Sequence, residues 1–345
     1  MRHAALTLLK GFGFFTRMKD SAWRQQRLLI LCYHGVSIDD ESHWEPLLFI
    51  SPEQLALRLK ALWDGKYAVL PLGDALERLY RRDLPPRSVA LTFDDGGYDF
   101  YRQAWPQLRQ YGFPATVYLT TYYSELQRPV PLILSYLLWK ARDTTGVELT
   151  EFGIGQTASL STAQGRQEIM SHLSHQANGQ ALNGEQKDRI AARLAEHLGI
   201  DYQRLMQKRI LHLMNREEVK QLAAEGVDFQ LHTHRHRTPL SEDLFRREIR
   251  ENRDLIVKAA GGVRNHFCYP SGAYRPEFLD WLAKEDVISA TTCDTGFATP
   301  GTNPLLLPRL VDTSARTGLE FESWLTGIGY FLSRRKRGRH AYVAE

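Results

Sequence analysis

The sequence has no uninterrupted apolar stretch of about 18 residues, the length that a helix needs to cross a bilayer. Residues 1–20 carry an early charge and several apolar residues, but Lys10 interrupts them and no small-residue cleavage site follows. We therefore expect neither a membrane span nor a cleaved signal peptide.

Cysteine is scarce, because the 345 residues include only Cys32, Cys268 and Cys293 and no two of these form a C-x-x-C pair. Three cysteines cannot all be paired, which argues against a secreted disulfide framework and for a reducing compartment. The cytoplasm, or the inner face of its membrane, is the expected location. We expect the three thiols to lie on strands as small buried side chains, and we assign them no chemistry.

Positive charge is also limited outside one segment. The formal net charge is +4, and residues 334–339 alone carry five cationic side chains, so the rest of the chain has a slight negative excess. This balance excludes a nucleic-acid-binding body. The basic tail at 333–345 is most simply a solvated terminus, with binding to anionic lipid as the alternative.

The first 26 residues alternate leucine and phenylalanine with arginine and lysine. This pattern predicts an amphipathic segment that either docks on the protein or lies on a membrane surface as a peripheral contact. Docking is favoured because short apolar helices usually pack against a core.

Strand and helix patterns alternate from residue 27 onward. Ser51, Pro52 and Gln54 form a capping box that opens a helix, and Asn215 begins another. The expected strands are 27–33, 88–93, 115–119, 227–231 and 266–269, and the expected helices are 51–65, 103–111, 215–226 and 242–260. Repeated βα units predict an α/β fold with a parallel sheet or a (β/α) barrel, whose chemistry lies at the carboxyl ends of the strands.

Residues 125–214 interrupt this alternation. They are polar and helical in pattern, with glycines and no clear strand, and they contain no catalytic motif. We expect a helical insertion, within a barrel of residues 27–332, that shapes a substrate groove or a partner surface.

Two adjacent carboxylates, Asp94 and Asp95, follow an expected buried strand and precede Gly96 and Gly97. Neighbouring carboxylates repel each other unless a cation lies beside them, so the pair indicates either a solvated turn or a metal site. Successive side chains of a strand point to opposite faces, and both aspartates reach one pocket only if the backbone turns there. The glycines permit that turn.

His232 and His236 follow another expected strand, four residues apart. Two such imidazoles and one strand-end carboxylate form a 2-His-1-carboxylate set with open positions for water and substrate. A histidine pair alone is weak evidence, because histidine-rich loops are commonly solvated. Combined with the aspartate pair, it predicts a metal site. His234 is expected to point away from the other two.

The segments Thr92-Phe93-Asp94-Asp95-Gly96 and His232-Thr233-x-x-His236 together resemble the signature of the polysaccharide deacetylases, the NodB-homology or carbohydrate esterase family four enzymes. The resemblance covers roughly residues 27–125 and 212–312. It implies a distorted (β/α) barrel and one divalent cation, usually zinc, with a water that hydrolyses N-acetyl or O-acetyl groups on a sugar polymer.

The same resemblance implies a role for each matched residue. Asp94 would be the general base, and Asp95, His232 and His236 would be the metal ligands. Thr233 would hold the histidine loop by hydrogen bonding. These roles agree with amide hydrolysis, which needs an activated water, a polarised carbonyl and a proton donor for the leaving amine.

A third family motif is altered, since Cys268-Tyr269-Pro270-Ser271-Gly272 falls where many members have Arg-x-Pro-Tyr-Gly. The backbone N–H of Ser271 still suits an oxyanion donor, with Tyr269 beside it in a substrate-positioning segment. The arginine that would orient Asp94 is absent from this motif. Arg309 is a candidate substitute, with Asp294 as its partner, and an ordinary buried salt bridge is an equal alternative.

The leucine and histidine that supply the acid near the carboxyl end of many family members are also absent. His34 ends the first expected strand, so it should reach the same barrel rim as the aspartates. A subgroup of exopolysaccharide deacetylases resembles this arrangement, with the acid histidine on an amino-terminal strand. His34 is therefore the candidate general acid, against the plain alternative of a structural histidine.

The sequence thus predicts a metal-dependent deacetylase of an acetylated carbohydrate, in the assembly of exopolysaccharide or cell-surface glycan. Two alternatives stay open. One is a catalytically impaired barrel that binds glycan or acts as a scaffold, and the other is a deacylase of a non-sugar amide.

Overall fold

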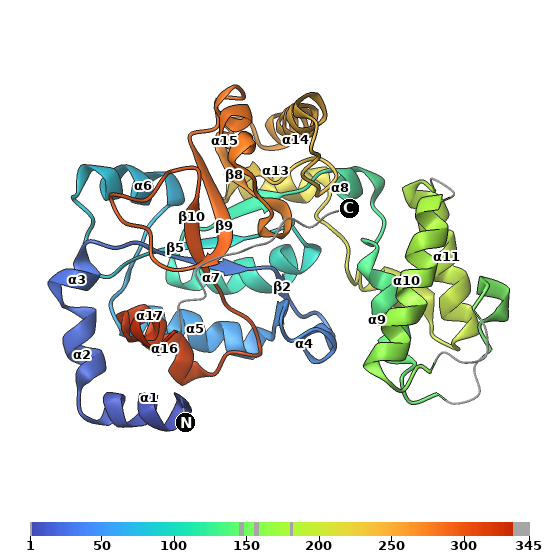
Figure 1. Ribbon diagram of the computed structural model, residues 1–345, viewed down its shortest axis with the longest axis horizontal. Coiled ribbons are helices and arrows are strands. Elements are labelled where there is room, and N and C mark those ends of the chain that lie inside the picture. Colours follow the sequence, from blue (N-terminus) through green and yellow to red (C-terminus); the bar gives the residue numbers. More distant parts are fainter. Residues whose placement is uncertain (1, 145–147, 155–158, 180–181, 334–345) are drawn as a thin grey trace.

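The computed structural model describes residues 2–144, 148–154, 159–179 and 182–333. The predicted basic tail, apart from Ser333, lies outside the described residues. Figure 1 shows a barrel surrounded by helices and, to one side of it, a separate group of helices that includes α9, α10 and α11.

Seven parallel strands close into a barrel, because the first strand pairs with β10 on one side and with β5 on the other. This confirms the predicted (β/α) barrel. The strands are β1 (Leu29–Tyr33), β5 (Ser88–Phe93), β6 (Thr116–Leu119), β7 (Asp228–Leu231), β8 (His266–Cys268), β9 (Ser289–Thr295) and β10 (Leu307–Val311). A short strand, β4 (Ala68–Val69), extends the sheet at β5, and β2 (Gly35–Val36) pairs with β3 (Phe49–Ile50) beside it.

The barrel strands are apolar on both faces because they are covered on both. β1 and β5 are buried along their whole length. Their side chains point alternately to the barrel interior and to the surrounding helices. Two of the covering helices, α5 and α13, begin at the capping residues that the sequence indicated. Ser51 and Asn215 each form a capping box at the start of a helix. A π-helical turn, Phe100–Ala104, precedes the helix that was expected from residue 103.

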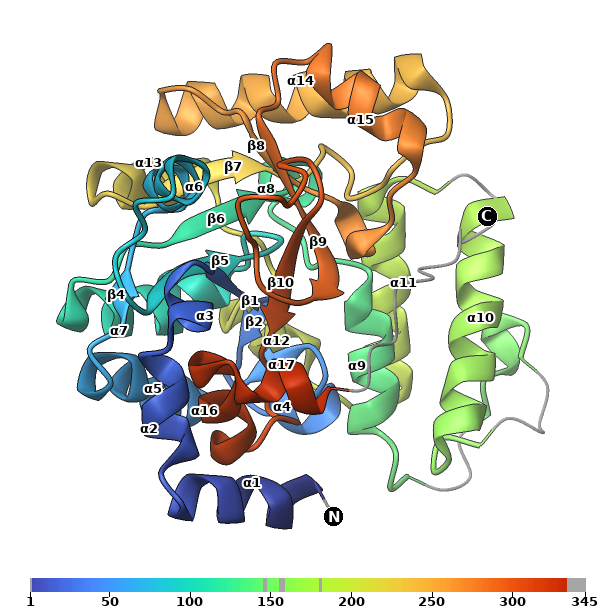
Figure 2. The ribbon, with the colours of Figure 1, turned by 60° about the vertical axis from the view of Figure 1, so that its left-hand side comes forward.

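The helices that surround or border the barrel are α4 (Glu41–Trp44), α5 (Pro52–Asp64), α6 (Leu72–Arg81), α7 (Trp105–Tyr111), α8 (Tyr122–Leu126), α13 (Arg216–Ala224), α14 (Glu242–Ala260), α15 (Pro276–Ala283), α16 (Gly318–Thr326) and α17 (Ile328–Leu332). Figure 2 shows α14 and α15 along one side of the barrel and α5 and α16 on another.

The segment predicted as an insertion folds into helices with an apolar core of their own. Its helices are α9 (Leu132–Lys140), α10 (Ala163–Gly179), α11 (Gly184–His197) and α12 (Tyr202–Gln207), with a 3-10 turn at Thr150–Phe152. Leu137, Ile169 and Leu194 are fully buried in this core. The two chain segments that join it to the barrel lie side by side, with a backbone bridge between Pro129 and His212.

The amino-terminal segment forms α1 (Arg2–Gly11), α2 (Phe14–Lys19) and α3 (Ala22–Gln25), which contact α16. Leu6 and Phe15 are buried against Ile328. Leu8 and Phe12 on the same segment are exposed, by 61% and 70%. In the described ranges, no helix combines the length and the apolar character that crossing a bilayer requires.

The separate core of the insertion predicts a local response to mutation. Leu194→Ala removes a fully buried side chain and should cost about 2–5 kcal/mol. We expect amide hydrogen exchange to accelerate in α9, α10 and α11 while the amides of β5, β6 and β7 keep their protection. The matched variant Leu91→Ala, in the barrel core, should show the reverse pattern, with less protection in the barrel strands than in α9, α10 and α11. If Leu194→Ala reduced amide protection in the barrel strands as much as in the insertion helices, the insertion would not be an independent unit.

Candidate active site

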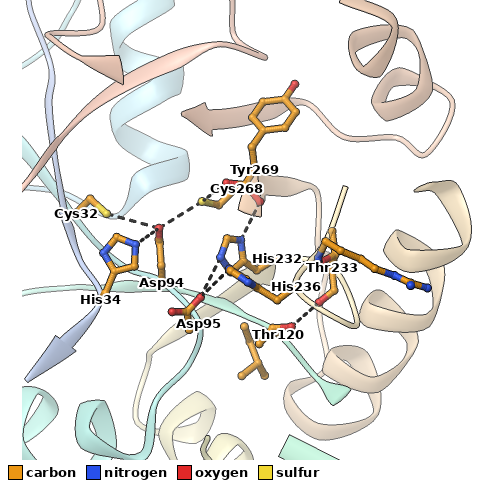
Figure 3. A network of polar contacts seen from close by, with 12 residues as sticks. Cys32, His34, Asp94, Asp95, Thr120, His232, Thr233, His236, Cys268 and Tyr269 are labelled. Carbon is orange, nitrogen blue, oxygen red and sulfur yellow. Dashed lines mark hydrogen bonds and ion pairs between the residues drawn. The ribbon is translucent and has the colours of Figure 1, made fainter. Parts of the chain in front are cut away.

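The carboxyl ends of the barrel strands bring together side chains that are far apart in the sequence. His34 follows β1, Asp94 and Asp95 follow β5, and the histidine loop follows β7. Figure 3 shows His34, both aspartates, His232 and His236 converging on one region. These five side chains therefore lie together at one rim of the barrel, as the sequence predicted.

The turn after β5 brings both aspartates to this region. Asp95 adopts a left-handed conformation with φ of 68°, and Gly96 follows with φ of 80°. The predicted turn therefore starts one residue earlier than the glycines, at Asp95 itself, and Gly97 does not take a positive φ. A left-handed aspartate costs free energy, and such residues are found where a site fixes them.

Asp95 and the two histidines form a compact ligand set. Asp95 Oδ1 lies 3.2 Å from His232 Nε2 and 3.2 Å from His236 Nε2. This carboxylate oxygen is buried but makes no hydrogen bond of acceptable geometry with the described residues. Three ligand atoms that face one another in this way, with the central oxygen unsatisfied, fit a divalent cation.

His232 is held in the tautomer that a metal ligand needs. Its Nδ1 lies 2.8 Å from the carbonyl oxygen of Cys268, which can only accept, so Nδ1 carries the proton and Nε2 is free. The backbone N–H of His232 donates to the side chain of Asn252. Burial lowers the pKa of His232, but Asp95 and Asp94 outweigh burial and raise it overall in the metal-free protein.

The histidine loop is not a helical turn. Thr233 and His236 both have positive φ, of 64° and 53°, and these two kinks turn the second imidazole back toward the first. Thr233 Oγ1 accepts a hydrogen bond from the backbone of Arg237, and Thr120 donates to the carbonyl oxygen of Thr233. His234 points elsewhere, with Nδ1 at 2.8 Å from the hydroxyl of Thr121.

Asp94 is bound by Arg309 in a two-pronged salt bridge. Arg309 Nη1 and Nη2 each donate to one carboxylate oxygen at 2.7 Å, and the two side chains are 0% and 2% exposed. Burial raises the pKa of Asp94, but the guanidinium outweighs it and holds that pKa well below its usual range. Arg309 thus occupies the orienting position that Cys268 leaves open.

The expected pairing of Arg309 with Asp294 is wrong. Arg309 uses its remaining donors on the carbonyl oxygen of Thr292 on the neighbouring β9, the hydroxyl of Thr92 on β5 and the sulfur of Cys268. Asp294 instead accepts a hydrogen bond from Tyr274 at 3.3 Å. A shift in register between β9 and β10 next to Arg309 accompanies this arrangement, as bulges often do beside functional sites.

Two thiols line the far side of Asp94. Cys32 and Cys268 donate to Oδ2 at 3.5 and 3.4 Å, and burial raises the pKa of both thiols, so they stay protonated. They are buried on strands, as expected, but they also contact the carboxylate of Asp94, which the sequence did not predict.

His34 lies between Asp94 and the solvent-facing cavity. Its Nε2 is 3.6 Å from Asp94 Oδ2, and its side chain is 18% exposed. Burial lowers the pKa of His34 despite the opposing charges of Asp94 and Asp95, so the imidazole is neutral at pH 7. The other ring nitrogen, Nδ1, is buried and has no hydrogen-bond partner among the residues described.

The altered third motif is placed less favourably than predicted. The hydroxyl of Tyr269 donates to the carbonyl oxygen of Leu305, and Figure 3 shows its ring directed away from Asp95 and the two imidazoles. Tyr269 therefore does not position substrate through its side chain. Ser271 sits in a tight turn, Pro270–Gly272, with φ of 55°. Its N–H stays a candidate oxyanion donor.

Sequence reasoning missed two polar residues near the cluster, one buried and one partly buried. Asn252 on α14 donates to the carbonyl oxygen of Leu119 while it accepts from His232, which ties the histidine loop to β6. Asp99 lies beside the cavity, accepts from the N–H of Val36, and has its pKa raised by burial to about 7. An asparagine among the apolar positions of an amphipathic helix was the available signal for the first.

The fold and this cluster define a polysaccharide deacetylase. The model of the polysaccharide deacetylase family matches residues 81–288, which include both aspartates and both metal-site histidines. The chain belongs to this family, whose members are hydrolases acting on carbon–nitrogen bonds other than peptide bonds.

Known relatives agree with this assignment. YxkH of Bacillus subtilis (strain 168), named as a polysaccharide deacetylase, is 32% identical over 104 residues, which are 29% of this chain and 35% of that protein. The Streptococcus pyogenes deacetylase PplD has the same fold, with a TM-score of 0.56, 19% identity, and coverage of 84% of this chain and 93% of its own. IcaB from Ammonifex degensii also has this fold, with a TM-score of 0.53 and 17% identity. The match covers 87% of this chain and 97% of the IcaB chain.

The buried ion pair predicts a pH-dependent loss of stability. Arg309→Met should leave the carboxylate of Asp94 buried without a cation, at a cost of about 3–5 kcal/mol near neutral pH. The native pair lowers the pKa of Asp94, so its stabilisation exists above about pH 4 and fades as the pH falls. In Arg309→Met, burial without the guanidinium raises the pKa of Asp94 instead, so the variant's carboxyl becomes neutral and less costly to bury as the pH falls. The free-energy difference between variant and native protein, from denaturant unfolding, should therefore shrink from pH 7 toward pH 4.

The double variant Asp94→Leu, Arg309→Met removes both charges and should recover stability relative to Arg309→Met. An unfolding free energy of Arg309→Met that stayed equal to the native value from pH 4 to pH 7 would contradict the assignment.

Proposed function

We propose that the protein is a metal-dependent hydrolase that removes N-acetyl groups from an acetylated carbohydrate. The observation that carries the proposal is the geometry around Asp95 Oδ1, a buried and unsatisfied oxygen that faces two imidazole Nε2 atoms at 3.2 Å. The name of the S. pyogenes relative, a deacetylase in complex with acetate, supports the same reaction.

Zinc is the proposed cation. Asp95, His232 and His236 would hold it, because imidazole nitrogens with one carboxylate are a common ligand set for this ion and leave positions open. When bound, the cation supplies Lewis acidity at the acyl carbonyl and at the attacking water.

Proton transfer falls to Asp94 and His34. Asp94 is ionised and oriented by Arg309, so it takes the proton of the water as general base. His34 is neutral and lies 3.6 Å from Asp94 Oδ2, which lets it receive that proton and deliver it to the leaving amine as general acid. The backbone N–H of Ser271 would donate to the developing oxyanion.

An impaired scaffold barrel has less support than it had from sequence. Its main argument was the arginine missing from the third motif, and Arg309 supplies that guanidinium from β10 with a two-pronged bond to Asp94. The acid histidine that is absent near the carboxyl end has a candidate replacement in His34. The site therefore favours catalysis.

We further propose that the enzyme works in the cytoplasm at the inner face of the membrane. Exposed apolar side chains lie on the amino-terminal helices and on α17, which pack together through Leu6, Phe15 and Ile328, and the sequence continues after α17 into the basic segment 334–339. The apolar side chains are Leu8, Phe12, Phe14 and Phe331. Apolar residues combined with cationic ones suit a surface of anionic lipid.

Metal content tests the ligand assignment. The purified protein should carry close to one divalent ion per chain, measured by inductively coupled plasma mass spectrometry. Asp95→Ala and His232→Ala should lose most of it, because each removes one of three ligands. Asp94→Asn should keep the ion while turnover falls, since that side chain moves a proton. Loss of the ion in Asp94→Asn, with retention in Asp95→Ala, would reverse the two roles.

Leaving-group chemistry tests His34. His34→Ala should lower kcat on an acetamido sugar by roughly 10²- to 10⁴-fold, with metal content and melting temperature nearly unchanged. An activated acetate ester has a leaving group that needs little protonation, so the variant should recover much of its activity on that substrate. An equal defect on ester and amide would show that His34 is not the acid.

A further inference from the structure

A cavity of about 450 Å³ opens beside the catalytic cluster and is lined there by His34, Asp95 and His236. Its size is typical of a small-molecule site. Away from the cluster its walls are largely apolar. They come from the β2–β3 region, from the two segments that join the insertion to the barrel, and from α9 and α10 of the insertion, and include Ile38, Leu48, Val130, Leu132, Met170 and Leu211.

Most polar groups in these walls already have partners within the protein. Arg235 pairs with Glu248 and Glu251, and the backbone N–H groups of residues 36 and 39 donate to two of the lining carboxylates. The ring of His212 donates to the carbonyl oxygen of Ile210, and Thr120 donates to that of Thr233, while Lys187 adds one ammonium group to the wall. A second sugar ring placed here would lose water from its hydroxyls and gain few hydrogen bonds in return.

The apolar surface continues into the insertion. A second cavity of about 150 Å³ lies among α9, α10 and α11, with Leu134 and Leu173 in its wall. Both cavities are lined by Tyr123, Pro131, Met170 and Lys187, so they adjoin, with one cationic side chain at the junction. Together they form a largely apolar path from the catalytic cluster into the helical insertion.

We propose that this path binds a hydrocarbon chain and that the substrate is an amphiphile, an acylamino sugar that carries such a chain. The proposal rests on the proposed function, because the sugar must reach Asp95 and the histidines. Each methylene group moved from water into an apolar wall strengthens binding roughly 4-fold, whereas a carbohydrate gains nothing comparable from these side chains.

The chain has two chemical sources, which share the same recognition. It is either the acyl group that is hydrolysed or an alkyl group attached to the sugar through its anomeric oxygen. Two substrate series separate them. One lengthens the N-acyl group of glucosamine from acetyl to octanoyl, and the other lengthens the glycoside of N-acetylglucosamine from methyl to octyl, below the micellar concentration.

In one of the two series kcat/KM should rise by at least about 10-fold with chain length. The double variant Leu132→Gln, Met170→Gln keeps side-chain size while it makes the path polar, and it should abolish most of that rise but leave the shortest substrate unaffected. Leu132 is 42% exposed, so folding should tolerate the change. Leu57→Gln, at an exposed leucine outside the cavity lining, is the matched control and should keep the rise.

A flat response in both series, with the acetamido methyl glycoside hydrolysed, would overturn this proposal and leave the deacetylase intact. If the metal-loaded protein hydrolyses no substrate of either series, the proposed function fails. Calorimetry of octyl glycoside binding then tests the hydrocarbon-chain site independently of catalysis. Tighter binding than the methyl glycoside, with a negative heat-capacity change that the double variant loses, supports the site. Equal binding of the two glycosides overturns it.

Discussion

The salt bridge between Asp94 and Arg309 is the interaction on which the site depends. It joins the end of β5 to β10 inside the barrel, and both partners are shielded from water. A carboxylate at this depth would be neutral without a cation, because burial favours the uncharged form. The pair therefore fixes both the orientation and the ionised state of Asp94. His34, Cys32 and Cys268 contact the same carboxylate, so their placement follows from it.

Backbone strain is concentrated beside this pair. Asp95, Thr233, His236 and Ser271 all have positive φ although none is glycine, and all follow barrel strands at the same rim. Each would relax at a small local cost if the neighbouring structure allowed it. Thr120 donates a hydrogen bond to the histidine loop and Asn252 accepts one from it, and the parallel barrel holds the strand ends. The rigid scaffold thus keeps three side chains in a geometry that an isolated loop would not adopt.

The sequence predicted what depends on short-range pattern. The βα alternation predicted a parallel sheet or a barrel, the family resemblance favoured the barrel, and the two motifs identified Asp94, Asp95, His232 and His236. Contacts across long separations were predicted less well. Arg309 was identified as a candidate, but its partner was misassigned to a carboxylate 15 residues away instead of one 215 residues away, because the register shift beside β10 leaves no trace in the local sequence. The direction of the Tyr269 ring likewise depends on neighbours from a distant segment.

The insertion enters and leaves through two adjoining segments, bridged between Pro129 and His212, and these same segments line the cavity above the catalytic cluster. Much of the cavity wall is thereby encoded apart from the strand ends that carry the catalytic cluster. Residues 125–214 can diverge, lengthen or be exchanged through one narrow junction while the strand ends that perform hydrolysis stay as they are. Such a division suits evolution by module replacement, in which a lineage acquires a new substrate without passing through an inactive ancestor.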